Sequence, residues 1–225
     1  MKNKFTMTVR GIRRARRTDD AIKRALFGAL SKIVRREGFM NITLKGICKS
    51  SQVNHNSIYT HYGSFEGLLE EYAAHHDYWI EDVGKIVPGL SADPKEYYCS
   101  VAEFLINALY DSKEYQAILT WEVAEDNKIT RQMAARREAV SQALMQHIGS
   151  TFAESGIDFA IISAVIVGGI NYLLLRRERS PFFGVDFAGE DGRQRLIKAV
   201  CTMIYALFSA IENPLIMING ERVKW

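Results

Sequence analysis

The sequence predicts an all-α protein in which an N-terminal helix-turn-helix unit of three helices precedes a larger bundle of helices. Three observations lead to this prediction. Apolar residues recur at spacings of three and four along most of the chain, which is the period of an amphipathic helix. No window alternates with period two for long enough to indicate a sheet. Residues 1–65 hold 14 Lys or Arg and 3 Asp or Glu, whereas residues 66–225 hold 15 and 23, so a basic unit precedes an acidic one.

The first helix is expected over residues 19–37. Thr18 is a suitable N-cap, and Gly38 supplies a C-terminal stop. Its apolar face comprises Leu26, Leu30, Ile33 and Val34. A basic N-terminal unit is typical of a protein that binds a polyanion, although a solvated run of charge is the alternative on this observation alone.

Two short helices are expected next, over about residues 43–50 and 54–62, and a longer one begins after Ser64. Thr43, Asn54 and Ser64 are the expected N-caps. Ile47, Val53 and Ile58 are spaced so that the two short helices cross steeply and bury one apolar contact against the first helix. This is the spacing of a helix-turn-helix.

The second short helix presents small polar side chains to solvent, namely His55, Asn56, Thr60 and His61. Side chains of this kind reach base edges in a major groove, and Asn is suited to adenine. Tyr59 and Tyr62 are equally compatible with packing and with DNA contact. The residues therefore favour double-stranded DNA as the partner.

These positions resemble the DNA-binding region of the TetR family of bacterial repressors. The residues that carry the resemblance lie between Leu26 and Leu69: they are Gly38, Phe39, Thr43, Ile47, Val53, the run Ile58-Tyr59-Thr60-His61-Tyr62, Ser64, Glu66, Leu68 and Leu69. The resemblance implies an all-helical homodimer that binds a palindromic operator, is released by a small-molecule effector and acts in the cytoplasm. It divides the chain into a DNA-binding domain over residues 1–64 and a regulatory and dimerisation domain over 65–225.

Three positions depart from the pattern of that family. Gln52 stands where the family usually has a turn glycine, Asn56 where it has a small residue, and Phe65 where it has lysine. Phe65 removes an expected phosphate contact, so either the arginine-rich N-terminal arm compensates for it or the affinity for DNA is unusually weak. The candidate DNA-binding residues are Arg13, Arg14, Arg16, Arg17, Thr43, Gln52, Asn54, His55, Asn56, Ser57, Tyr59, Thr60 and His61, of which the resemblance implies that Thr43 and Tyr59 contact phosphates.

The rest of the chain is expected to form helices over about residues 95–111, 114–126, 129–149, 156–178 and 188–211. The last two are expected to form the dimer contact, because they carry more apolar surface than one small domain needs. Residues 159–175 lack charge, but this stretch is shorter than the roughly 20 apolar residues of a membrane span, which leaves a membrane helix as the disfavoured alternative.

Aromatic side chains recur in these later helices, and a pocket lined by them would suit a mainly apolar effector. The candidates are Tyr97, Phe104, Tyr110, Trp121 and Tyr172, although most are equally compatible with core packing. No cofactor, metal or catalytic site is expected. His75 and His76 are adjacent and point about 100° apart on a helix, which disfavours a shared metal, and no catalytic motif is present. An enzyme in the helical domain and a DNA-binding protein without effector remain the alternatives.

The three cysteines are widely spaced and contain no CxxC pair. This arrangement suggests neither a disulfide framework nor a zinc site, and it fits a reducing compartment. No apolar stretch follows the basic N-terminus, so no signal peptide is expected.

Overall fold

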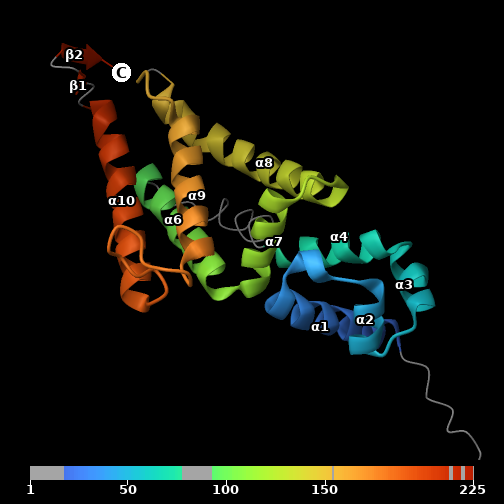
Figure 1. Cartoon of the computed structure of the whole chain (residues 1–225). Coiled ribbons are helices and arrows are strands. Elements are labelled where there is room, and N and C mark those ends of the chain that lie inside the picture. The colour runs from blue at the N-terminus through green and yellow to red at the C-terminus, as the bar shows by residue number, and fades with distance from the viewer. Residues whose placement is uncertain (1–17, 78–92, 154, 213–214, 219–220, 225) are drawn as a thin grey trace, which may run out of the picture.

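The computed structural model describes residues 18–77, 93–153, 155–212, 215–218 and 221–224, which form a predominantly helical molecule (Figure 1). The all-α prediction is confirmed. The elements in chain order are α1 (Asp19–Glu37), η1 (Phe39–Asn41), α2 (Leu44–Ser51), α3 (His55–Tyr62), α4 (Phe65–His76), α6 (Pro94–Asp111), α7 (Lys113–Ala124), α8 (Lys128–Ile148), η3 (Gly149–Phe152), α9 (Phe159–Arg176), α10 (Glu190–Glu212), β1 (Leu215–Ile218) and β2 (Glu221–Lys224).

A short antiparallel hairpin near the C-terminus was not predicted. β1 pairs with β2, with Leu215 opposite Lys224 and Ile218 opposite Glu221. Each strand has four residues, which is too short for a period of two to be distinguished from chance in the sequence.

Polar side chains start the N-terminal helices as the sequence predicts. Thr18, Thr43, Asn54 and Ser64 each precede a helix, and each side chain accepts a hydrogen bond from a backbone N–H of the first turn. These bonds satisfy donors that have no partner within the helix. Gly38 ends α1 at φ 77°, a backbone conformation that L side chains rarely adopt. Local sequence signals therefore set these helix boundaries.

Within the described ranges, the buried apolar residues form two clusters. The N-terminal cluster combines α1, α2, α3 and α4 with residues from α7 and α8: it comprises Leu26, Leu30, Ile33, Val34, Phe39, Ile42, Ile47, Val53, Ile58, Leu68, Leu69, Tyr72, Ala73, Ile118, Trp121, Ile129 and Met133. α4 begins just after the expected domain boundary at residue 64 but buries its apolar face in this N-terminal cluster.

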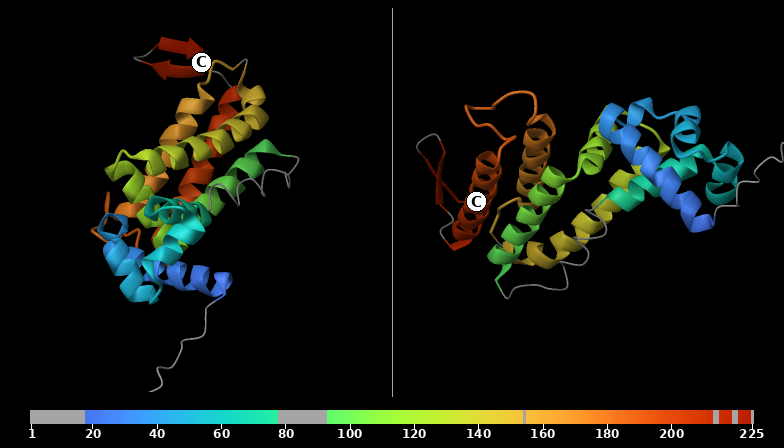
Figure 2. Two further views of the ribbon diagram at one scale, coloured as in Figure 1. Left: turned by 90° about the vertical axis from the view of Figure 1, so that its right-hand side faces the viewer. Right: turned by 90° about the horizontal axis from the view of Figure 1, so that it is seen from below.

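The second cluster lies among α6, α7, α8, α9 and α10. α6 packs against both α9 and α10, and α8 extends back toward α4 (Figures 1 and 2). The buried face of α6 includes Val101, Leu105 and Leu109. α6 is thus the central helix of the second unit, and α7 and α8 connect that unit to the N-terminal one.

Contacts across the junction between the units are apolar and ionic. The Phe39 ring stacks on Trp121 with centroids 4.8 Å apart and planes 4° from parallel. Arg35 Nε donates to Glu114 Oε1 at 2.6 Å, and the Glu114 carboxylate is almost fully buried. These contacts fix α1 and η1 against α7.

α9 and α10 each bury one face and expose the other. Ile166, Ile170 and Leu174 of α9 face the core, whereas Ile161 and Val165 are 61% and 68% exposed. By length and composition alone, α9 and α10 are each apolar enough to cross a membrane, which is weak evidence for a span. Figure 1 shows them lying alongside α6, so the exposed apolar residues are the outer surface of a bundle.

Candidate nucleic-acid interface and an adjoining cavity

The two short helices α2 and α3 form a helix-turn-helix on the N-terminal unit. Ile47 of α2, Val53 of the turn and Ile58 of α3 are buried, at 0%, 6% and 0% exposure. The predicted core of the motif is therefore confirmed. Since these three side chains point inward, the opposite side of α3 faces solvent.

The turn between α2 and α3 depends on a left-handed residue. Gln52 has φ 54° and ψ 31°, as expected for a residue that replaces a turn glycine. The hydroxyl of Ser51 donates to the Ile47 carbonyl at 2.7 Å and accepts from Val53 N at 3.2 Å. These bonds hold the turn and so set the angle at which α3 leaves it.

The exposed face of α3 presents the side chains that the sequence singles out. His55, Asn56, Tyr59 and Thr60 are exposed, and the Thr60 hydroxyl donates to the Asn56 carbonyl at 2.9 Å. The rings of His55 and Tyr59 meet edge to face, 6.4 Å apart. The face is polar and without carboxylates, which suits contact with bases and phosphates.

Other α3 residues contact the rest of the protein or are partly buried. His61 Nε2 lies 3.7 Å from Asp19 Oδ1 at the start of α1. Ser57 and Tyr62 are half-buried, and burial, with a contribution from Glu71, raises the pKa of Tyr62 to about 12. Between the two tyrosines whose roles were open, Tyr59 is the solvent-facing one.

Further candidates flank α3. Thr43, Gln52 and Asn54 are exposed, although the Thr43 and Asn54 oxygens already cap their helices. Two cations that were not among the predicted residues, Lys45 and Lys49, are exposed one turn apart on α2 beside the turn. Their spacing of four residues was the available signal.

The structure describes position 65, where the family pattern has lysine, but not the arginine-rich arm. Arg13, Arg14, Arg16 and Arg17 lie outside the described residues. Phe65 is half-buried and packs against the N-terminal cluster, so it adds to the core where the family pattern places a phosphate ligand.

A cavity of about 580 Å³ opens between α8 and α9. α6 and α7 contribute Val101, Leu105 and Leu119 to its lining, and α9 contributes Ile166 and Val167. Cavities of this volume accommodate small organic molecules.

Ionic side chains occupy the part of the cavity formed by α7 and α8. Arg137 of α8 donates to Asp77 Oδ2 at 2.8 Å and also pairs with Glu122 of α7. The Asp77 side chain is fully buried and follows directly on α4. Burial raises the pKa of Glu122, an effect that Arg137 opposes, and burial also raises the pKa of Tyr115 nearby. The cavity lining is thereby connected to the end of α4.

None of the five aromatic residues predicted to bind an effector lines this cavity. Tyr97 is buried in the second cluster, and Phe104 packs half-buried against it. Trp121 stacks on Phe39, and Tyr172 is 56% exposed on α9. These residues lie elsewhere because residues of one composition face different sides of their helices, and only tertiary packing determines which side meets the cavity.

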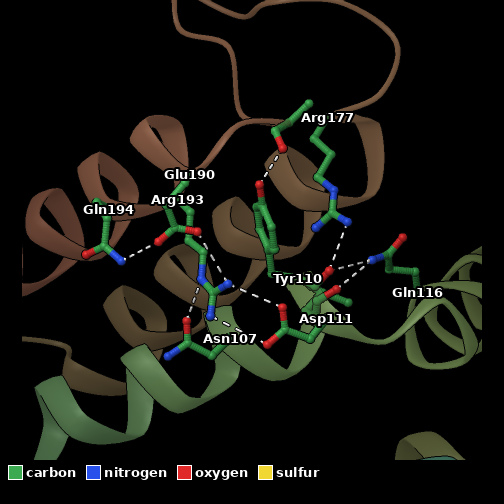
Figure 3. Close-up of polar contacts among 10 residues, drawn as sticks. Asn107, Tyr110, Asp111, Gln116, Arg177, Glu190, Arg193 and Gln194 are labelled. Carbon is green, nitrogen blue, oxygen red and sulfur yellow. Dashed lines mark hydrogen bonds and ion pairs between the residues drawn. The ribbon is translucent and has the colours of Figure 1, made fainter.

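Tyr110, the fifth candidate, lies between two guanidinium groups (Figure 3). The Arg177 and Arg193 carbons Cζ lie 4.0 and 4.8 Å from its ring centroid, and its hydroxyl donates to the Ala188 carbonyl. Arg193 Nε also donates to Asn107 Oδ1 at 2.8 Å. Tyr110 therefore fastens the segment between α9 and α10 to the end of α6.

The adjacent histidines of α4 pack against aromatic rings. His75 lies 5.6 Å from the Phe27 ring and His76 4.5 Å from the Tyr72 ring. Burial lowers the pKa of His76. Within residues 18–77 and the other described ranges, no group of three metal-ligating side chains comes together.

No protein-family model matches the chain, and no curated protein matches its sequence. Solved structures do match it. A TetR family transcription regulator from Marinobacter aquaeolei VT8 superimposes with a TM-score of 0.61 at 17% identity, covering 82% of this chain and 95% of that one.

Two further solved structures are similar to the same extent. NalD of Pseudomonas aeruginosa, the secondary repressor of the MexAB-OprM multidrug efflux pump, gives a TM-score of 0.61 at 15% identity over 84% of this chain and 96% of its own. A TetR-family regulator from Bordetella parapertussis 12822 gives 0.60 at 13% identity, over 81% and 93%. The chain therefore has the fold of TetR-family transcription regulators, as its helix-turn-helix residues suggested.

Proposed function

We propose that the protein is a transcription regulator that binds operator DNA as a homodimer and is released by a small-molecule effector. The observation that carries the proposal is the exposed polar face of α3, held by a buried helix-turn-helix core. Asn56 and His55 on this face would contact base edges, and Tyr59 would contact phosphate. The cytoplasm is the corresponding location.

Two sets of variants test the DNA-binding part. His55→Ala and Asn56→Ala are expected to lower the preference for operator over random DNA, whereas Arg13→Ala with Arg14→Ala is expected to weaken all DNA similarly and to flatten the salt dependence. The operator is first obtained by sequencing genomic fragments that the purified protein captures. Gln194→Ala on α10 is the control, because Gln194 is exposed and lies on the second unit. Full discrimination by the His55 and Asn56 variants would exclude α3 as the recognition helix.

The exposed apolar face of α9 and α10 supports the homodimer. Ile161 and Val165 of α9 and Met203 of α10 are each at least 50% exposed, and a second copy packed on this face would remove them from water. In such a dimer the two α3 helices must lie about 34 Å apart to enter successive major grooves, which makes the operator palindromic.

Sedimentation of Val165→Arg tests the dimer. The expected result is a folded monomer, because a buried arginine without a partner opposes association. Met40→Arg is the matched control, since Met40 is 65% exposed on the N-terminal unit. A dimer of unchanged stability in the Val165 variant would contradict the assignment of this face.

The cavity favours an effector-controlled regulator over a DNA-binding protein without effector. α7 and α8 contribute to both the cavity and the N-terminal cluster, so a ligand that displaces them also displaces the N-terminal unit. The measurement is a titration of a bound compound with and without operator. An inducer must bind the DNA complex more weakly than the free protein, by the same factor as it weakens DNA binding.

A further inference from the structure

Among the described residues, carboxylates outnumber cations around the cavity. The charged residues in the described part of its lining are Glu122, Arg137 and Glu138. Asp77 is not part of the lining but pairs with Arg137. One guanidinium thus faces the two carboxylates of Asp77 and Glu122. Glu138, on the exposed surface of α8, adds a further negative charge.

Of the two carboxylates that pair with Arg137, Glu122 is the one that a ligand would reach. Its side chain is 24% exposed, whereas the side chain of Asp77 is fully buried. An excess carboxylate in a partly desolvated site is stabilised by a nearby cation. The charge distribution therefore favours a positively charged group beside Glu122.

The α9 side of the cavity offers a second acceptor. Asn171 Oδ1 is buried and has no hydrogen-bond partner within the described part of the chain. Arg137 Nη2 is likewise buried without a described partner and would donate to a neutral ligand oxygen. An anion at Nη2 would instead lie close to the carboxylates of Asp77 and Glu122, which repel it.

We propose that the cavity binds an amphiphilic cation, whose apolar body lies between α8 and α9 and whose protonated amine pairs with Glu122. The proposal rests on the proposed function only in treating this cavity as the effector site. It specifies the chemical class of the effector: an aromatic or aliphatic body that fits within about 580 Å³ and carries one amine.

Three fluorescent probes of one shape test the charge preference on the full-length protein. They are 1-pyrenebutylamine, 1-pyrenebutanol and 1-pyrenebutyric acid, and fluorescence anisotropy measures their dissociation constants. The amine is expected to bind at least about tenfold more tightly than the alcohol, and the acid most weakly. An acid that binds as tightly as the amine, or an amine that fails to bind, would overturn the proposal.

Variants locate the amine. Glu122→Gln is expected to weaken 1-pyrenebutylamine at least about tenfold and to leave 1-pyrenebutanol within about twofold. Glu103→Gln is the matched control: it makes the same change of charge at an exposed position of α6 outside the cavity. Unchanged amine affinity in folded Glu122→Gln protein would refute the contact.

A third variant keeps the test decisive if Glu122→Gln fails to fold. Ser141→Phe narrows the cavity from α8 and leaves the ion pairs in place, so it is expected to weaken the amine and the alcohol alike. Undiminished binding would show that the probes occupy another surface, such as the exposed face of α9, and would overturn the proposal.

Operator binding is measured separately by electrophoretic mobility shift. A protein that binds the amine through Glu122 but binds no DNA would contradict the proposed function alone. A protein that binds operator but prefers the acid would contradict the effector class alone.

Discussion

Replacement of Arg137 by methionine is expected to destabilise the protein strongly. Methionine retains most of the apolar length of the side chain and removes the charge. The substitution leaves the fully buried Asp77 carboxylate without the guanidinium that donates to it at 2.8 Å, and it also leaves Glu122 without its partner. Loss of this cation from beside a buried carboxylate is the principal cost.

Removal of one partner from a buried ion pair costs about 3–5 kcal/mol. For a chain of this size, each kcal/mol shifts the midpoint of thermal unfolding by about 2–4 °C. Arg137→Met is therefore expected to lower the midpoint by about 6–20 °C at neutral pH. Arg136→Met is the matched control: Arg136 is exposed and its nitrogen lies 3.4 Å from Glu70, so a change of about 1 kcal/mol or less is expected.

The penalty in Arg137→Met also depends on pH. Arg137 lowers the pKa of Glu122, which burial already raises above its ordinary value of 4.5, so its removal raises that pKa further. A carboxyl group whose pKa is raised in the folded state destabilises the protein above that pKa and ceases to do so below its unfolded value. The difference from wild type should therefore be largest at neutral pH and shrink as the pH falls toward 4.5.

Circular dichroism during thermal and urea unfolding measures these differences, and a double-mutant cycle with Asp77→Asn isolates the pair. Asp77→Asn removes the carboxylate charge that pairs with Arg137, so the double variant should be more stable than the sum of the single effects predicts. Additive effects, or an Arg137→Met variant within about 1 kcal/mol of wild type, would refute the buried pair.

Three further predictions concern the N-terminal unit. Gln52→Gly should raise stability by about 1 kcal/mol because it relieves the left-handed backbone at φ 54°, which urea unfolding measures. Ile58→Ala should cost about 2–5 kcal/mol, since Ile58 is fully buried, and should abolish operator binding in a mobility-shift assay. Burial lowers the pKa of His76 below 6.5, because the folded state disfavours the charged imidazole. His76 therefore costs no stability above pH 6.5, where it is neutral in both states, and destabilises the folded protein as the pH falls. His76→Gln should accordingly flatten the loss of stability below pH 6.5, with the exposed His75→Gln as control.

The helix-turn-helix could be predicted because its signals are local. Thr43 and Asn54 act as caps within three residues of the donors they satisfy, and the burial of Ile47 and Ile58 follows from helical spacing. The left-handed turn at Gln52 was expected from the resemblance, because the family usually has a turn glycine at this position. Each of these features depends on interactions over a few residues, so sequence periodicity and capping rules apply directly.

The cavity could not be predicted in the same way. Tyr97 and Tyr98 are adjacent on α6 and both are buried, yet Tyr98 alone lines the cavity, because neighbours on a helix point about 100° apart. The pair of Asp77 with Arg137 spans 60 residues of sequence. Such features depend on how α6, α7, α8 and α9 pack, which composition does not specify.

Communication between the cavity and the DNA-binding unit follows from α7 and α8. In α7, Trp121 is in the N-terminal cluster and its neighbour Glu122 lines the cavity. In α8, Met133 is in the N-terminal cluster, and Arg137, one turn later, lines the cavity. A ligand shifts a conformational equilibrium only by its difference in affinity for the two states. Binding in the apolar part of the cavity without disturbing these helices would therefore leave DNA affinity unchanged. A ligand that competes with Arg137 for Glu122 alters the contacts of both helices and of Asp77 at the end of α4, and it is this competition that would make a bound cation an inducer.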